Sequence, residues 1–215
     1  MINIPVIRDY YKDKEYIFTK KSFELKPGLT VIVGCNGSGK TTLLNQIKHF
    51  CESQNIPHFK FDNLHDGGRN ARDKAGFFGN FQFLAESLSS SEGENINMNI
   101  GNCAMDIGRL IRNNPTAKQI VIMFDAMDSG LSVDYIIEVK EYLFKTIIND
   151  CSSKNIEVYI IASANEYELA RGEECLRLPS LTYKPFKNYE EYRKFIIETR
   201  NKKNKRYGHD PFEFT

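Results

Sequence analysis

An eight-residue stretch from Gly34 to Thr41 reads Gly-Cys-Asn-Gly-Ser-Gly-Lys-Thr and matches the P-loop pattern G-x-x-x-x-G-K-[ST]. Its glycines let the backbone wrap closely around phosphates, and the N–H groups of the loop and of a following helix then face them. We expect Lys40 to contact the β- and γ-phosphates and the Thr41 hydroxyl to bind Mg²⁺. The residues assigned to phosphate binding are Asn36, Gly37, Ser38, Gly39, Lys40, Thr41 and Thr42. The alternative is a glycine turn that carries a lysine by chance.

The residues around this stretch favour the phosphate-binding interpretation. An apolar run at 29–33 predicts a buried strand, and residues from about 41 to 54 predict a helix. A strand, a glycine-rich loop and a helix in this order form the structural context that the motif requires.

A second apolar run, residues 120–124, ends on Asp125. A continuous apolar run is typical of a strand buried on both faces of a parallel sheet. An aspartate at the end of such a strand, downstream of a P-loop, is the usual second half of a nucleoside-triphosphate site, where it holds Mg²⁺ through the water shell of the ion. The alternative is a residue that only caps the strand end.

The remaining patterns predict an α/β fold with a mainly parallel sheet flanked by helices and with antiparallel strands at the N-terminus. The other expected elements are strands at 2–8 and 16–25, a strand at 59–61, a helix at about 95–112 opened by the capping-box pair Ser91 and Glu94, a helix at 132–150, a strand at 158–162, a hairpin at 175–186 and a helix at 188–205. Residues 62–80 read as a surface loop. We expect one domain over 1–215, with an insertion at 62–114 and a basic C-terminal helix at 188–206.

The composition limits the class of protein. A chain of 215 residues with 41% hydrophobic residues suits one α/β domain, and 29 basic against 28 acidic residues imply no partner through overall charge. The five cysteines lack metal-site spacing and read as reduced thiols. No apolar stretch approaches about 18 residues, and the first residues lack signal-peptide features. A cytoplasmic protein without a membrane partner is expected.

Four segments together resemble the ATP-binding cassette (ABC) ATPases, above all the soluble SMC, RecF and RecN branch. Residues 36–42 read N-G-S-G-K-T-T, and residues 124–132 are similar to the Walker B strand and D-loop of that branch. Residues 91–94, Ser-Glu-Gly-Glu, resemble the signature S-x-G-[QE], and residues 160–166 resemble the switch strand. The resemblance covers about residues 29–170. A small cassette without a coiled coil is similar to phage-encoded ATPases, for which the location would be the host cytoplasm.

The resemblance implies that ATP and Mg²⁺ are bound and that two copies of the chain form a head-to-tail homodimer around two ATP molecules. Ser91, Gly93 and Glu94 would belong to the signature helix, which points its N-terminus at the γ-phosphate held by the other copy. Gln82 matches the glutamine that senses Mg²⁺ and the attacking water; the alternative is an ordinary surface glutamine. The resemblance thus implies Lys40, Gln82, Asp125 and Asn165 as catalytic residues and Thr41, Gln82 and Asp125 at the metal.

Two departures from the family pattern predict slow hydrolysis. The family has a glutamate after the Walker B aspartate, where this chain has Ala126, and a histidine at the switch position, where it has Asn165. Losing a positioned base commonly lowers the rate 10²–10⁴-fold. Asp128 and Glu166 are candidate replacements.

The short segment between residues 82 and 91 leaves no room for the helical subdomain of a transporter or for a coiled coil, which argues against a transporter and against a long-armed DNA tether. The main hypothesis is a slow ATPase acting in DNA-related or phage processes. The alternatives are an ATP-gated dimerisation switch and, as a lesser one, a small-molecule kinase with a lid carrying Arg69 and Arg72. Nucleic acid or another protein remains a candidate partner, and the basic residues at the C-terminus that would bind nucleic acid are Arg193, Lys194, Arg200, Lys202, Lys203, Lys205 and Arg206.

Overall fold

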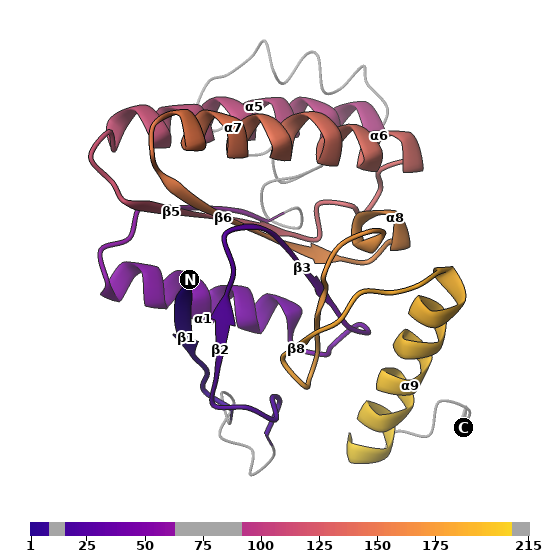
Figure 1. Cartoon of the computed structure of the whole chain (residues 1–215). Coiled ribbons are helices and arrows are strands. Elements are labelled where there is room, and N and C mark those ends of the chain that lie inside the picture. The colour runs from indigo at the N-terminus through magenta and orange to yellow at the C-terminus, as the bar shows by residue number, and fades with distance from the viewer. Residues whose placement is uncertain (9–15, 63–91, 208–215) are drawn as a thin grey trace, which may run out of the picture.

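The computed structural model describes residues 1–8, 16–62 and 92–207 (Figure 1). Its centre is a six-stranded sheet in the order β4-β5-β6-β3-β7-β8. The strands are β3 (Gly28–Val33), β4 (His58–Asp62), β5 (Gln119–Asp125), β6 (Glu157–Ala164), β7 (Leu176–Arg177) and β8 (Thr182–Tyr183). Neighbouring strands are parallel except β7 and β8, which confirms the predicted mainly parallel sheet.

The strand order brings the polar residues that follow the strands to one edge of the sheet. β6 lies between β3, which leads into the P-loop, and β5, which ends at Asp125. Because these three strands are parallel, their carboxyl ends meet at the same edge. Loops that follow β3, β5 and β6 are therefore neighbours in space.

Alternation along β5 divides the core between the two faces of the sheet. Ile122 and Phe124 face one apolar cluster, and Val121 and Met123 face the other. All four side chains are fully buried, which confirms a strand that is covered on both faces.

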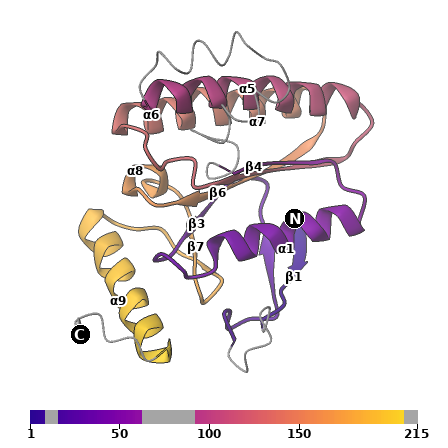
Figure 2. The ribbon, with the colours of Figure 1, turned by 180° about the vertical axis from the view of Figure 1, so that it is seen from behind.

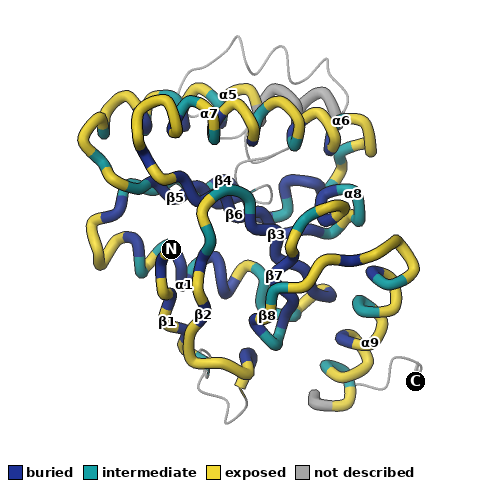
Figure 3. Tube along the Cα trace, viewed as in Figure 1, coloured by how far each residue is buried: buried dark blue, intermediate teal, exposed yellow. Residues whose placement is uncertain are grey.

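Helices cover the two faces of the sheet (Figure 1, Figure 2). On one face lie α1 (Lys40–Ser53) and a small antiparallel sheet of β1 (Ile2–Pro5) and β2 (Ser22–Leu25). On the other lie α5 (Glu92–Asn113) and a continuous helical stretch formed by α6 (Val133–Glu138), the π-helical segment η1 (Val139–Phe144) and α7 (Lys145–Ser153). Figure 3 shows the sheet as the most buried layer.

The C-terminal part of the chain lies beside the end of β3. After β6 come the short helix α8 (Tyr167–Ala170), the β7–β8 hairpin and the helix α9 (Tyr189–Tyr207). Figure 1 shows α9 at the side of the molecule, next to the hairpin. None of the helices within the described ranges is long and apolar enough to cross a membrane.

The elements expected from the sequence are present with shifted ends. The N-terminal strands are shorter than expected, and the helix expected at 132–150 is present over 133–153 with the π-helical segment η1 in its middle. The loop expected at 62–80 lies outside the described residues, except for Asp62, which ends β4.

Candidate nucleotide-binding site

The P-loop joins β3 to α1 and depends on glycine at two positions. Gly39 is the residue before α1 and has a φ of 94°, and Gly37 has a φ of 73°. A Cβ at Gly39 would lie 2.8 Å from Cγ2 of Ile17, which no ordinary packing allows. The N–H of Ser38 donates a 3.0 Å hydrogen bond to the carbonyl of Cys35 and closes the turn.

Lys40 extends back along the P-loop. Its Nζ donates a hydrogen bond of 2.9 Å to the carbonyl oxygen of Gly34. Burial lowers the pKa of Lys40, and the charges of Asp128 and Asp125 oppose this shift only in part. The ammonium group is therefore partly desolvated, and the nearby carboxylates do not fully compensate its charge. A phosphate group would supply the missing negative charge.

Asp125 stands at the end of β5 and is only 3% exposed. Its Oδ1 accepts a 2.9 Å hydrogen bond from the hydroxyl of Ser163, and that hydroxyl accepts one of 2.8 Å from the N–H of Ala126. Its buried Oδ2 accepts no hydrogen bond from the described residues. Sequence reasoning missed Ser163 as a partner of Asp125; pairing β5 with β6 would have found it, because Phe124 is in register with Ala162.

Lys60 on β4 is a second residue that sequence reasoning missed. Its Nζ lies 3.8 Å from a carboxylate oxygen of Asp125 and 3.8 Å from one of Asp62, and it donates a 2.8 Å hydrogen bond to Oδ1 of Asn45 on α1. Asp62 and Asp125 are in register at the ends of β4 and β5. The sequence signal that could have indicated Lys60 is its position between Phe59 and Phe61 in an expected strand.

Asn165 follows β6 and is tied to the loop after β5. Its Nδ2 donates to Oγ of Ser129 at 2.9 Å and to Oδ1 of Asp128 at 3.2 Å. Oδ2 of Asp128 accepts the N–H groups of Asn165 and Glu166, at 2.6 and 2.8 Å. Burial raises the pKa of Asp128, and these N–H donors partly offset the shift. Both oxygens of Asp128 thus hold the segment that follows β6.

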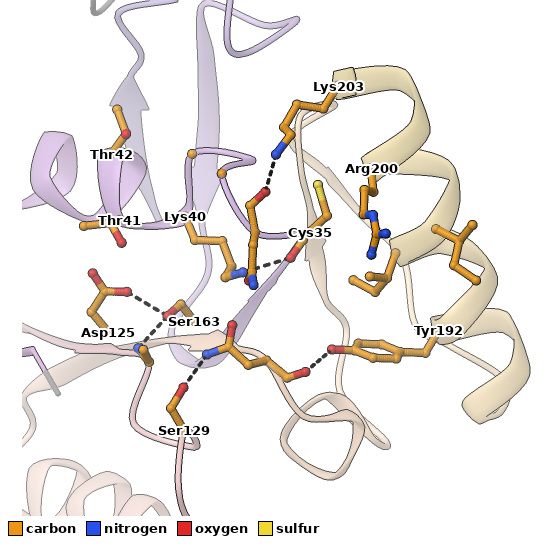
Figure 4. Close-up of a pocket in the computed structure, with 18 of the residues that line it drawn as sticks. Cys35, Lys40, Thr41, Thr42, Asp125, Ser129, Ser163, Tyr192, Arg200 and Lys203 are labelled. Carbon is orange, nitrogen blue, oxygen red and sulfur yellow. Dashed lines mark hydrogen bonds between the residues drawn. The ribbon is translucent and has the colours of Figure 1, made fainter. Parts of the chain in front are cut away.

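Residues of the P-loop, together with Asp125, Ser163 and Asn165, line one cavity of about 1070 Å³ (Figure 4). That volume is enough for a nucleotide. The structure brings most of the expected site residues to its wall: Asn36, Gly37, Gly39, Lys40, Thr41, Thr42, Asp125 and Asn165. Among the expected P-loop residues, Ser38 does not line this wall, and its buried Oγ has no hydrogen-bond partner among the described residues.

The structure describes only some of the residues expected to form the signature and the glutamine position. Gln82 and Ser91, like Arg69 and Arg72, lie outside the described residues. The backbone of Gly93 and Glu94 forms part of the first turn of α5, and their side chains lie outside the description. Their roles remain predictions.

The donors at the cavity fit Mg²⁺. Thr41 is exposed at the cavity, and the buried Oδ2 of Asp125 has no hydrogen bond from the described residues. Over those same residues, no group of three or more His, Cys, Asp or Glu side chains could hold a metal alone. A cation here would need the Thr41 hydroxyl and phosphate oxygens as further ligands.

A P-loop that opens a helix, with an aspartate ending a strand of the same parallel sheet, is the arrangement of the P-loop NTPases. A family profile described as an AAA domain matches residues 16–207. The chain therefore belongs to this AAA domain family, whose members are generally ATP hydrolases. No curated protein sequence matches it. The family match confirms the prediction from the sequence that the chain is a P-loop ATPase.

Proposed function

We propose that this chain binds Mg-ATP and hydrolyses it slowly as an ABC-type ATPase. The observation that carries the proposal is the convergence of Lys40, Thr41 and Asp125 on one cavity beside Ala126, which has no acceptor side chain. Lys40, Thr41 and Asp125 supply the groups that bind the phosphates and Mg²⁺. Ala126 lacks the carboxylate that would activate the attacking water.

Each binding residue has a role that follows from its contacts. Lys40 exchanges the carbonyl of Gly34 for the β- and γ-phosphates, so that its buried charge gains an anionic partner. Thr41 and Asp125 hold Mg²⁺, which when bound neutralises charge on the phosphates. Ser163 fixes the orientation of Asp125 through its 2.9 Å hydrogen bond.

Slow turnover follows from what surrounds the attacking water. Ala126 provides no base, and the carboxylate of Asp128 is occupied by N–H groups of Asn165 and Glu166. The Nδ2 group of Asn165 already donates hydrogen bonds to Ser129 and Asp128. A site without a positioned base is expected to lose about 10²–10⁴-fold in rate.

The proposal includes a head-to-tail homodimer that encloses two ATP molecules. α5 ends at Asn113 and β5 begins at Gln119, so the first turn of α5 lies toward the carboxyl edge of the sheet, the edge of the P-loop. A helix N-terminus at this edge suits the phosphates of a second copy. A role in DNA-related or phage processes is supported by the family resemblance alone.

A second candidate function is an ATP-gated dimerisation switch with little or no hydrolysis. Ala126 and the occupied amide of Asn165 favour it. The lesser alternative, a small-molecule kinase, depends on Arg69 and Arg72.

The test is the mass of the purified protein in solution with and without Mg-ATP, measured together with phosphate release. An ATP-dependent dimer that releases phosphate faster than a Lys40→Ala control supports the slow ATPase. A dimer that releases phosphate no faster than the control supports the switch. An unchanged mass with no phosphate release would reopen the kinase alternative.

A further inference from the structure

One face of α9 forms the wall of the cavity beside the P-loop. Residues spaced by three and four positions lie on one side of a helix. The α9 residues at the cavity follow this spacing: Tyr189, Tyr192, Arg193, Ile196, Ile197, Arg200, Lys203 and Asn204. Figure 4 shows Arg200 and Lys203 on the side of α9 that is turned toward the P-loop.

The start of α9 is fixed to the rest of the site. The hydroxyl of Tyr192 donates a 2.9 Å hydrogen bond to the backbone carbonyl of Asn165. Arg177 on β7 pairs with Glu191 at 3.1 Å, and its guanidinium lies 3.8 Å from the ring centroid of Phe186. This end of α9 is therefore anchored to the loop after β6 and to the hairpin.

The other end of α9 contacts the P-loop itself. Nζ of Lys203 donates a 2.9 Å hydrogen bond to the backbone carbonyl of Asn36. A Cβ at Gly37 would lie 3.2 Å from the same Nζ, so glycine leaves this lysine more room at the loop. The middle of α9, which carries Arg200, is thus held over the phosphate-binding loop.

The wall of the cavity carries an excess of positive charge. Among the described residues that line it, the cationic side chains are Lys40, Arg193, Arg200 and Lys203, and the one carboxylate is Asp125. Two of the α9 cations already have partners, since Arg193 lies 3.8 Å from Glu190 and Lys203 binds Asn36. Arg200 forms no ion pair with any residue that the structure describes.

We propose that Arg200 binds the terminal phosphate of the ATP held by the P-loop of the same chain. The inference rests on the proposed function, because it needs ATP in this cavity. A guanidinium suits the role, since its planar fork of N–H donors matches phosphate oxygens. Lys40, Asp125 and Asn165 line the same cavity as Arg200 and mark the region of the terminal phosphate and the metal.

As a consequence, α9 supplies a cation that binds the phosphate of the ATP in its own chain. In the proposed head-to-tail dimer, the γ-phosphate is contacted by the signature helix of the other copy. Arg200 provides such a contact before any second copy arrives, and it distinguishes ATP from ADP in the monomer.

The test is the ratio of ATP to ADP affinity of the full chain with Mg²⁺, measured by calorimetry at a concentration at which the protein is a monomer. The variant is Arg200→Ala, and the matched control is Lys202→Ala, because Lys202 is an exposed basic residue of the same helix that does not line the cavity. We expect Arg200→Ala to weaken ATP binding at least about tenfold while ADP affinity changes less than about twofold. Lys202→Ala should leave both affinities unchanged.

Two results would overturn the inference while the proposed function stands. One is an Arg200→Ala protein that keeps the wild-type preference for ATP over ADP. The other is an equal loss of ATP affinity in Arg200→Ala and Lys202→Ala, which would reflect general charge rather than a specific contact. Wild-type protein that binds neither nucleotide would instead contradict the proposed function, and the inference with it. Circular dichroism of each variant checks that it is folded.

Discussion

The hydroxyl of Ser163 lies 2.9 Å from Oδ1 of Asp125 and donates a hydrogen bond to it from the neighbouring strand. The same hydroxyl accepts the N–H of Ala126 at 2.8 Å. Ser163 is fully buried, and its contact with Asp125 is buried as well. One side chain thus fixes the aspartate and the backbone of the residue after it.

We expect Ser163→Ala to lower stability and weaken the effect of Mg²⁺ on nucleotide binding. The change removes the hydroxyl that binds the N–H of Ala126 and the buried carboxylate of Asp125, which should lower the free energy of unfolding by about 1–3 kcal/mol. Urea unfolding and nucleotide titrations with and without Mg²⁺ measure the two effects. Ser153→Ala is the control, because its exposed hydroxyl donates only to the carbonyl of Asp150 and should change stability by less than about 0.5 kcal/mol. Equal stability losses in the two variants would contradict the role of Ser163.

Lys60 balances two carboxylates at the edge of the sheet. Its Nζ lies 3.8 Å from both Asp62 and Asp125, and its side chain is only 14% exposed. In Lys60→Met protein the two carboxylates face each other without this cation, so we expect the nucleotide-free protein to lose about 1–3 kcal/mol of unfolding free energy. Mg²⁺ should recover part of the loss, because it adds positive charge beside Asp125.

Thermal unfolding with and without Mg²⁺ measures this recovery. Lys48→Met is the matched control, since Lys48 is an exposed lysine of α1 that lies 3.6 Å from Glu52, where an ion pair contributes little. If Mg²⁺ raises the melting temperature of both variants equally, Lys60 does not compensate charge at Asp125.

The parts of the site that could be predicted are those that a short, continuous stretch of sequence specifies. The P-loop is recognised by the spacing of its residues, and Asp125 follows an apolar run that is typical of a strand buried on both faces. The class of fold follows from these runs and from the helices between them. Such signals need no knowledge of which strand lies next to which.

The residues that were missed depend on strand order and on distant packing. Ser163 and Lys60 reach Asp125 only because β6 and β4 flank β5 in the sheet. The C-terminal basic residues were candidates for nucleic-acid binding, and the sequence did not indicate that Arg200 and Lys203 also line the cavity. A contact such as that of Lys203 with Asn36 joins residues far apart in the chain, and no local pattern indicates it.

Burial of a thiol makes stability fall at alkaline pH. Cys51 is fully buried, and desolvation raises its pKa to about 12. An unfolded cysteine has a pKa of about 8.5. The contribution to stability is therefore fully present below pH 8.5 and is lost as pH rises toward 12, because the unfolded state then releases its proton first.

We expect the stability difference between the wild type and Cys51→Ala to narrow by about 2 kcal/mol between pH 8 and pH 10.5. The difference, rather than either value alone, cancels the titration of the lysines and tyrosines that both proteins share. Urea unfolding at each pH measures it. A difference that stays constant over this range would show that the thiol of Cys51 does not retain its proton in the folded protein.

A carboxylate at position 126 should accelerate hydrolysis. Ala126 follows Asp125 directly, where its side chain lines the cavity but offers no acceptor. We expect Ala126→Glu to raise phosphate release from Mg-ATP by about 10²-fold, because a positioned base commonly contributes 10²–10⁴-fold. Ala126→Gln is the matched control: it has the same length and the same strain at a φ of 52° but no basic oxygen, so its rate should stay low. If both variants bind ATP and release phosphate equally slowly, the attacking water does not lie beside residue 126, and the slow rate has a cause other than the missing carboxylate.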